Sequence, residues 1–72
     1  MIILKLKKEL FSWAYITTAA NAYQAIANIE VSNMTDYWEC HFTDCKYGEE
    51  LTAAEFENYL IDLMNCKNDN NN

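Results

Sequence analysis

The side chains best suited to chemistry are concentrated in one stretch of the chain, residues 36–45. This stretch holds the only histidine, His41, and two of the three cysteines, Cys40 and Cys45. Thiolate sulfur and imidazole nitrogen are the ligands that structural zinc prefers, and a thiol near a histidine also suits nucleophilic catalysis. Any site in this protein is therefore expected to involve residues 36–45.

The spacing of these residues argues against both kinds of chemistry. Cys40 and His41 are neighbours in a strongly strand-like segment, so their side chains point to opposite faces. A zinc site needs about four converging ligands, and Cys66 adds only one distant thiol to Cys40 and Cys45. A reactive thiol needs a cation or a helix N-terminus beside it, whereas only Lys46 is near Cys45 in the sequence and acidic residues crowd the loop. Cys40 is predicted to be a small buried hydrophobe, and a thiol or zinc protein is the less favoured alternative.

Catalysis is not predicted elsewhere in the chain either. General acid–base chemistry needs a second positioned group beside the histidine, and His41 has only Glu39 and Thr43 as neighbours on its own face. The sequence shows no Ser-His-Asp order, glycine-rich phosphate loop or paired carboxylate motif. We therefore predict a protein that is not an enzyme and that needs no cofactor.

The charge of the chain narrows the classes of partner. The 72 residues carry a formal net charge of -6 and include no arginine, so nucleic-acid binding is not expected because it depends on clustered Lys and Arg. An acidic surface suits a basic protein partner. No segment is long and apolar enough for a membrane span or a signal peptide, so we expect a cytoplasmic protein with reduced thiols.

Hydrophobic periodicity predicts the elements of the first half of the chain. Residues 2–8 alternate between apolar residues and lysine, which indicates a half-buried strand. Trp13, Ile16, Ala20 and Tyr23 recur at three- and four-residue spacing, which predicts a helix over about residues 13–24 with these side chains on one apolar stripe, and Ser12 is placed to cap it. Residues 27–31 alternate again, and the strand of residues 36–45 follows so closely that an antiparallel hairpin is expected.

The second half is predicted to end in a helix and a tail. Thr52 and Glu55 match a capping box, and an apolar stripe follows from Phe56 to Met64. Residues 67–72 are rich in asparagine and are expected to be a disordered tail, which leaves residues 1–66 as a single small domain.

The order β-α-β-β-α predicts an α+β fold, in which a small three-stranded sheet has two helices packed on one face. Whether the first strand pairs with the second or with the third is left open by the pattern.

This fold would give the third strand two different faces. Trp38, Cys40 and Phe42 are predicted to face the core. Tyr37, Glu39 and His41 are predicted to lie on the open face, which could bind an extended peptide or be an ordinary solvated surface.

On the last helix Asn58 and Asp62 are four residues apart and flank the apolar stripe. Solvated surface is the favoured interpretation, and a partner contact is the alternative. The residues named as candidates for partner binding are therefore Tyr37, Glu39, His41, Asn58 and Asp62.

Several short motifs resemble a known family. Residues 8–12 (Lys-Glu-Leu-Phe-Ser) precede the first helix, residues 29–31 (Ile-Glu-Val) form the returning strand, and residues 56–62 (Phe-Glu-Asn-Tyr-Leu-Ile-Asp) lie in the last helix. Together they resemble the HxsD-like proteins of His-Xaa-Ser systems. The positions that match are Phe11, Ala19, Ala20, Tyr23, Phe56, Asn58, Leu60 and Asp62.

The resemblance implies a role that is not catalytic. Members of this family look like accessory proteins of radical SAM maturases, which modify ribosomally made peptides. The implied partners are the precursor peptide, whose leader would be captured as an added strand or along a groove, and the maturase itself. The alternative function is a small acidic inhibitor of the phage or plasmid type that binds a basic protein surface. Homodimerisation is a further expectation, because a small core gains burial from a partner.

Overall fold

The structure, a computed structural model, describes residues 1–69, and side chains are described up to residue 65. Its elements follow the predicted order β-α-β-β-α. They are β1 (Ile2–Lys7), α1 (Trp13–Ala22), β2 (Asn28–Asn33), β3 (Tyr37–Thr43) and α2 (Glu49–Asp69).

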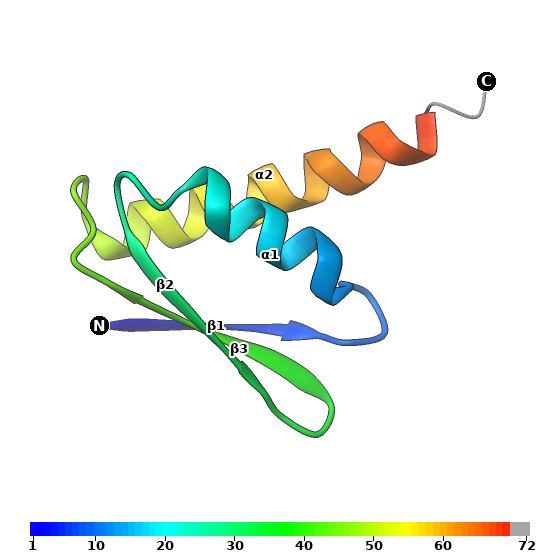
Figure 1. The fold of residues 1–72 in the computed structure, drawn as a ribbon, viewed down its shortest axis with the longest axis horizontal. Helices are drawn as coiled ribbons and strands as arrows, with labels where there is room; N and C mark the ends of the chain where they lie inside the picture. Colours follow the sequence, from blue (N-terminus) through cyan, green and yellow to red (C-terminus); the bar gives the residue numbers. More distant parts are fainter. Residues whose placement is uncertain (70–72) are drawn as a thin grey trace.

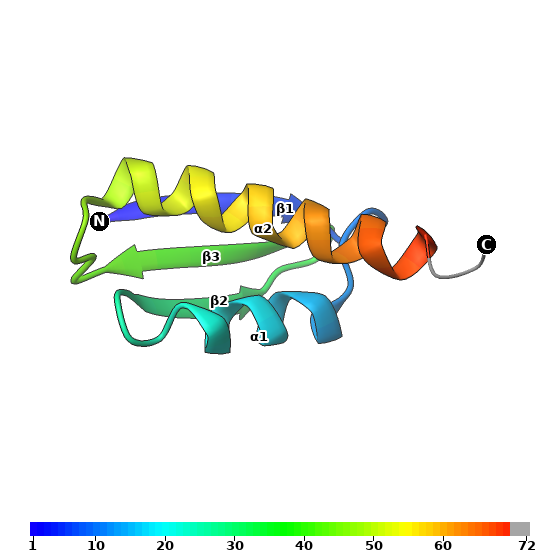
Figure 2. The same ribbon diagram turned by 90° about the horizontal axis from the view of Figure 1, so that it is seen from above.

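The three strands form one antiparallel sheet in the order β1-β3-β2, so β3 is the central strand. This order answers the question that the sequence pattern left open: β1 pairs with β3 and not with β2. Figures 1 and 2 show both helices on the same side of the sheet, with α2 over the β1 side and α1 next to β2. The predicted α+β fold is thus confirmed.

The two helices begin in different ways. Ser12 caps α1 as predicted, because its Oγ accepts a hydrogen bond from the Tyr15 amide across 3.4 Å. The capping box predicted for α2 is wrong: the helix begins at Glu49, and Thr52 is a buried residue of its first turn. Gly48 has a φ of 95°, a conformation that glycine adopts without strain. The chain therefore turns into the helix earlier, and Thr52 Oγ1 donates to the Gly48 carbonyl across 2.6 Å.

The core lies between the central strand and the two helices. Phe42 of β3 meets Phe56 of α2 edge to face, with 5.2 Å between the ring centroids, and Tyr23 packs against the same ring at 5.6 Å. Such aromatic pairs stabilise a core beyond the area that they bury. The buried cluster consists of Leu6, Ile16, Ala19, Cys40, Phe42, Ala53, Phe56 and Leu60.

Trp13 departs from the predicted buried stripe of the first helix. Its side chain is 49% exposed, whereas Ala19 is fully buried. The small side chain of Ala19 fits the close contact inside the core, and the large ring of Trp13 packs at the rim against Trp38, with 5.2 Å between ring centroids. The position of Trp38 is fixed by its Nε1, which donates to the Phe11 carbonyl across 2.9 Å.

The end of α2 passes the predicted domain boundary at residue 66, because the helix is described through Asp69. The rest of the predicted asparagine-rich tail, residues 70–72, lies outside the described residues, and its disorder stays a prediction. Within residues 1–69, neither helix is both long and apolar enough to cross a membrane.

Candidate functional site

The central strand β3 separates its side chains by face, as the alternation predicted. Cys40 and Phe42 are fully buried on the face that the helices cover. Tyr37, Glu39 and His41 are half-buried on the opposite face, below which Figure 1 shows no described element. The structure therefore brings these three candidates together in one row on an open sheet face.

Glu39 and His41 form a pair within this row. His41 Nε2 and Glu39 Oε1 lie 2.8 Å apart, and the two side chains are 27% and 19% exposed. A partly exposed pair of this kind adds little to stability. It does hold the imidazole and the carboxylate in one orientation, as a preformed polar surface requires.

The sheet register shows which neighbours the sequence interpretation missed. Glu39 lies opposite Lys5 of β1, and His41 lies between Ile3 of β1 and Glu30 of β2. The ammonium of Lys5 is also 5.3 Å from the ring centroid of Tyr37, within the range of a cation–π contact. Alternation alone could not place Lys5 and Glu30 beside this row, because that also requires knowing that both outer strands pair with β3.

Two depressions lie at opposite ends of the sheet, one on the side of α1 and one at the end of β1 beside the β2–β3 turn. The first, of about 430 Å³, is located where α1 ends and β2 begins. The second, of about 510 Å³, adjoins Tyr37 and is lined by Lys7, Lys8, Glu9, Thr35, Asp36 and Tyr37. Neither holds a histidine or a cysteine, so neither resembles the catalytic cleft of an enzyme that uses those groups.

The other two candidates lie on a different surface. Asn58 and Asp62 are exposed on the outer face of α2, where they form one helical stripe with the exposed Glu55. Since α2 packs on the covered face of the sheet, this stripe is separated from the row at His41 by the whole core. The five predicted residues therefore form two surfaces and not one.

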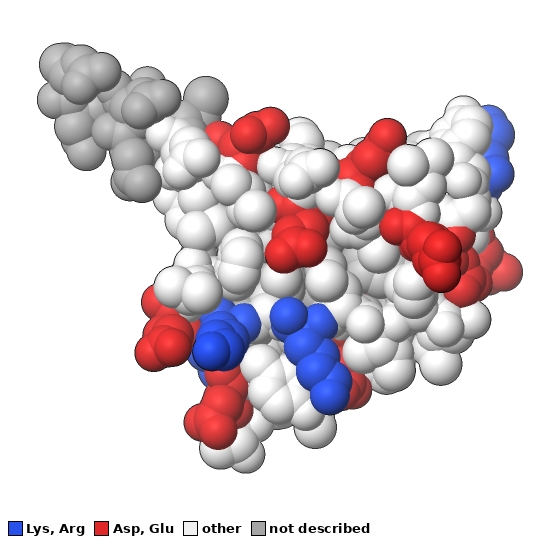
Figure 3. All heavy atoms as spheres, turned by 180° about the vertical axis from the view of Figure 1, so that it is seen from behind, with Lys and Arg blue, Asp and Glu red and all other residues white. Residues whose placement is uncertain are grey.

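The charge distribution supports this division. The described carboxylates on α2 are those of Glu49, Glu50, Glu55, Glu57 and Asp62. Figure 3 views the molecule from behind and shows mainly acidic atoms over its upper part, where α2 lies, with a basic group at the upper edge and with basic and acidic groups together on the sheet side below. The sheet side thus carries both signs of charge, whereas the outer surface of α2 is acidic.

The two cysteines whose side chains are described, Cys40 and Cys45, have the environment of structural residues, and the side chain of Cys66 lies outside the described part of the chain. Cys40 is fully buried, and burial raises the pKa of its thiol to about 11, which leaves it protonated and unreactive at neutral pH. Cys45 is half-buried and its Sγ donates to the Thr43 carbonyl across 3.7 Å. Among the described residues, no three His, Cys, Asp or Glu side chains lie together as metal ligands would.

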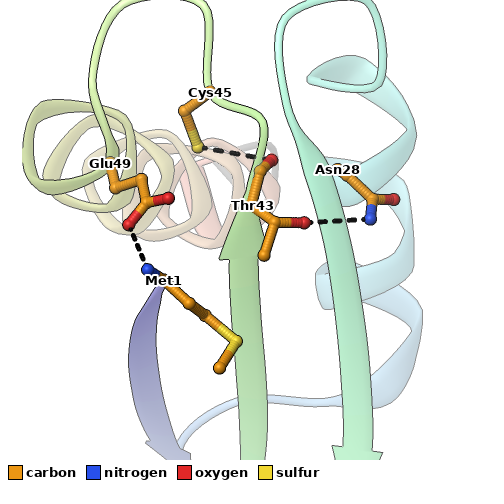
Figure 4. A network of polar contacts seen from close by, with 5 residues as sticks. All are labelled: Met1, Asn28, Thr43, Cys45 and Glu49. Carbon is orange, nitrogen blue, oxygen red and sulfur yellow. Dashed lines mark hydrogen bonds and ion pairs between the residues drawn. The ribbon is translucent and has the colours of Figure 1, made fainter.

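A set of polar contacts joins the elements at the end of the sheet shown in Figure 4. Asn28 Nδ2 of β2 donates to Thr43 Oγ1 of β3 across 3.0 Å. The ammonium of Met1 lies 2.8 Å from Glu49 Oε1 at the start of α2. These contacts connect strand ends to each other and to the helix, and they have no free acid–base group aimed into a cavity.

Comparisons with protein-family models, with curated proteins and with solved structures found no match to this chain. The likeness to the HxsD-like proteins therefore stays a prediction. Its motif positions nevertheless fall into two groups in the fold. Phe56, Leu60 and Ala19 are buried in the core, whereas Asn58 and Asp62 are exposed.

Proposed function

We propose that this protein is a non-catalytic, peptide-binding accessory protein of the kind that the HxsD-like resemblance implies. Its partner would be the leader of a ribosomally made precursor peptide, or the radical SAM maturase that modifies it. The observation that carries the proposal is the open sheet face, on which Tyr37, Glu39 and His41 form a partly desolvated row flanked by two outer strands without a further neighbour.

The chemistry of this face suits a peptide better than it suits plain solvation. The exposed side chain of Ile3 lies directly opposite His41, and the ring of Tyr37 lies beneath Lys5. Apolar and aromatic surface next to fixed polar groups is typical of protein interfaces. The outer strands also offer backbone donors and acceptors, which recognise an extended chain independently of its side chains.

Calorimetric titration tests the proposal directly. The protein is titrated with the leader peptide of a precursor encoded next to its gene, and separately with the neighbouring maturase. We expect saturable binding to at least one of them, with a negative heat-capacity change from burial of apolar surface. Absence of binding to both would contradict the proposal.

Matched variants locate the binding surface. His41→Ala and Tyr37→Ala are expected to weaken binding by about tenfold, since half-buried aromatic and charged groups dominate interfaces. Asn58→Ala, on the opposite layer, is the control and should bind as the parent does. Equal losses for all three variants would place the interface elsewhere.

A second candidate function is an acidic inhibitor that occupies a basic protein surface. The observation that favours it is the stripe of Glu55, Asn58 and Asp62 on the exposed side of α2, on a helix with further carboxylates. Such a complex would weaken steeply as salt is raised. It would also lose affinity on Asp62→Asn and keep it on His41→Ala, the reverse of the peptide-binding pattern.

A further inference from the structure

The two outer strands of the sheet differ in which residues offer free backbone groups. In antiparallel pairs, hydrogen-bonded and non-hydrogen-bonded pairs alternate. The Met34 amide donates to the Tyr37 carbonyl and the Lys8 amide donates to the Asp36 carbonyl, both across 3.1 Å. Counting back from these bonds, the outward N–H and C=O groups belong to Ile29, Val31 and Asn33 on β2, and to Ile3, Lys5 and Lys7 on β1.

The β1 edge is protected against strand addition. Two of its three outward-facing residues, Lys5 and Lys7, are exposed lysines. Lysines on an edge strand disfavour the approach of another strand because their charge would have to be desolvated or displaced. The Lys5 ammonium is in addition engaged by the Tyr37 ring. An extended partner is therefore not expected on this side of the sheet.

The β2 edge lacks this protection. Its outward-facing residues Ile29 and Val31 are uncharged, and neither proline nor a bulge interrupts the strand. The only charged residue of β2 is Glu30, which is exposed on the open face. Within the described part of the chain Glu30 makes no ion pair, and His41, which lies directly opposite it, is paired with Glu39.

A hollow lies beside this edge on the side that carries the helices. The backbone of α1 approaches α2 more closely than it approaches β2, and Figure 2 shows α1 running alongside β2. The depression of about 430 Å³ lies at the beginning of β2. It is lined from three sides: by Ala20 of α1 and Gln24 of the turn after it, by Asn28 and Ile29 of β2, and by Asp44 and Lys46 of the loop after β3.

We infer that the outer edge of β2 is the docking strand of this protein, and that its occupant is an extended, cationic peptide segment with alternating apolar and basic residues. This inference rests on the proposed function. It specifies which strand edge binds the peptide, which residues of that strand pair with it, and which side chains the peptide carries. Backbone groups of Ile29 and Val31 pair with the peptide. The residue opposite Glu30 is Lys or Arg.

The alternation follows from the geometry of strand addition. Residues directly opposite each other in an antiparallel pair lie on the same face. Side chains opposite Ile29 and Val31 point to the helix side, and the one opposite Ile29 reaches the hollow that Ile29 lines, where a small or apolar group fits. The side chain between them points to the open face beside Glu30, where a cation complements the unpaired carboxylate.

A second copy of the chain satisfies these conditions less well. Two copies would each bring a net charge of -6, and like charges repel on association. The β2 segment, residues 28–33, contains no lysine that could pair with Glu30 of another copy. Charge complementarity therefore favours a cationic peptide over self-association.

The experiment uses the full chain and two synthetic peptides of seven residues, one alternating valine with lysine and one alternating valine with glutamate. Binding is measured by calorimetry, and amide hydrogen exchange is followed by NMR. We expect the lysine peptide to bind more tightly than the glutamate peptide. Saturation with it should slow exchange of the Ile29 and Val31 amides by about tenfold or more, with unchanged exchange at Ile3 and Lys5.

A pair of proline variants tests the edge itself. Val31→Pro and Lys5→Pro each remove one outward N–H without removing a bond to β3, since proline is tolerated where the amide faces solvent. Val31→Pro should weaken the lysine peptide by about tenfold, from one lost hydrogen bond and the steric block. Lys5→Pro should leave the affinity within about twofold.

Glu30→Lys tests the charge at an exposed position and does not depend on a proline being accommodated. The variant should prefer the glutamate peptide. The affinity for each peptide should change by about threefold, as expected for one exposed ion pair. An unchanged preference for the lysine peptide would overturn the assignment of the cation to the Glu30 position.

Three further outcomes would overturn the inference and leave the proposed function standing. Protection at Ile3 and Lys5 would place the peptide on β1. Protection of Ile29 and Val31 that grows with protein concentration and needs no peptide would give the edge to a second copy. Binding of a natural leader but of neither synthetic peptide would exclude the alternating cationic pattern. Failure of leader and maturase alike would instead contradict the proposed function.

Discussion

The two faces of the sheet are built from alternate residues of the same strand, yet they differ in almost every physical property. On the covered face, Cys40 and Phe42 have no exposed surface. On the open face, Tyr37, Glu39 and His41 are half-buried, Glu39 and His41 contact each other, and Tyr37 contacts Lys5 of β1. Stability is therefore expected to reside in one set and recognition in the other, so that substitutions should separate the two.

The largest expected effect is on the covered face. Phe42→Ala should lower the free energy of unfolding by about 3–5 kcal/mol, because it removes a fully buried ring that meets Phe56 and leaves a cavity. Urea denaturation measures the loss. Because a domain this small has only a few kcal/mol of stability, a large fraction of the variant should be unfolded at room temperature even without urea. Tyr37→Ala is the matched control and should cost about 1 kcal/mol or less. Similar losses would show that the two faces do not differ as described.

A second effect of the covered face is seen in the dependence of stability on pH. Burial raises the pKa of the Cys40 thiol from 9.0 to about 11, so the fold favours the neutral thiol. This contribution is present below pH 9 and is lost as pH rises to 11, since the unfolded state ionises first. The loss should reach about 2–3 kcal/mol, measured by denaturation at several pH values.

Cys40→Ala provides the control for this dependence. The variant is less stable at neutral pH, and its stability should fall less steeply between pH 9 and 11. Burial, with the Glu55 carboxylate and Tyr59 nearby, also raises the pKa of Tyr23, and this contribution acts in the same direction in both proteins. Parallel pH profiles would contradict the role given to Cys40.

On the open face the effect on stability should be much smaller. His41→Ala removes the contact with Glu39 and is expected to change the free energy of unfolding by about 0.5 kcal/mol or less, because the pair is partly exposed. Thermal denaturation tests this. A loss comparable to that of Phe42→Ala would mean that the open face is part of the core energetics and is not a surface reserved for a partner.

The smallest effect is expected where the chain end meets α2. Glu49→Gln removes the ion pair with the Met1 ammonium, in which the two side chains are 49% and 34% exposed. The change should be about 0.5 kcal/mol or less and should vanish at high salt. A loss of the same size in a protein whose N-terminal amine is acetylated would indicate that Glu49 acts through the helix N-terminus and not through Met1.

Alternation made the two faces of β3 predictable, because neighbouring residues of a strand must point to opposite sides. The periodic stripe likewise predicted α2, with Phe56 and Leu60 buried. The start of α2 was missed because the φ of Gly48 lets the helix begin a turn before the capping motif at Thr52.

Features that depend on distant parts of the chain were not predictable from the pattern. Spacing alone put Trp13 on the apolar stripe of α1, whereas its ring packs at the rim against Trp38 of β3, a contact between distant parts of the chain. His41 lies opposite Ile3 on one side and Glu30 on the other. This pairing follows from the strand order, which local sequence does not encode. The same strand order distinguishes the lysine-protected edge from the open one.

The central claim is that the sheet, and not the acidic outer face of α2, receives the partner. NMR titration of the labelled protein with the natural leader peptide tests it most directly, since every backbone amide reports at once. The account predicts shifts confined to β2 and the open face of β3, around Glu30 and His41, with Asn58 and Asp62 unchanged. Shifts confined to Asn58, Asp62 and their neighbours on α2 would contradict it.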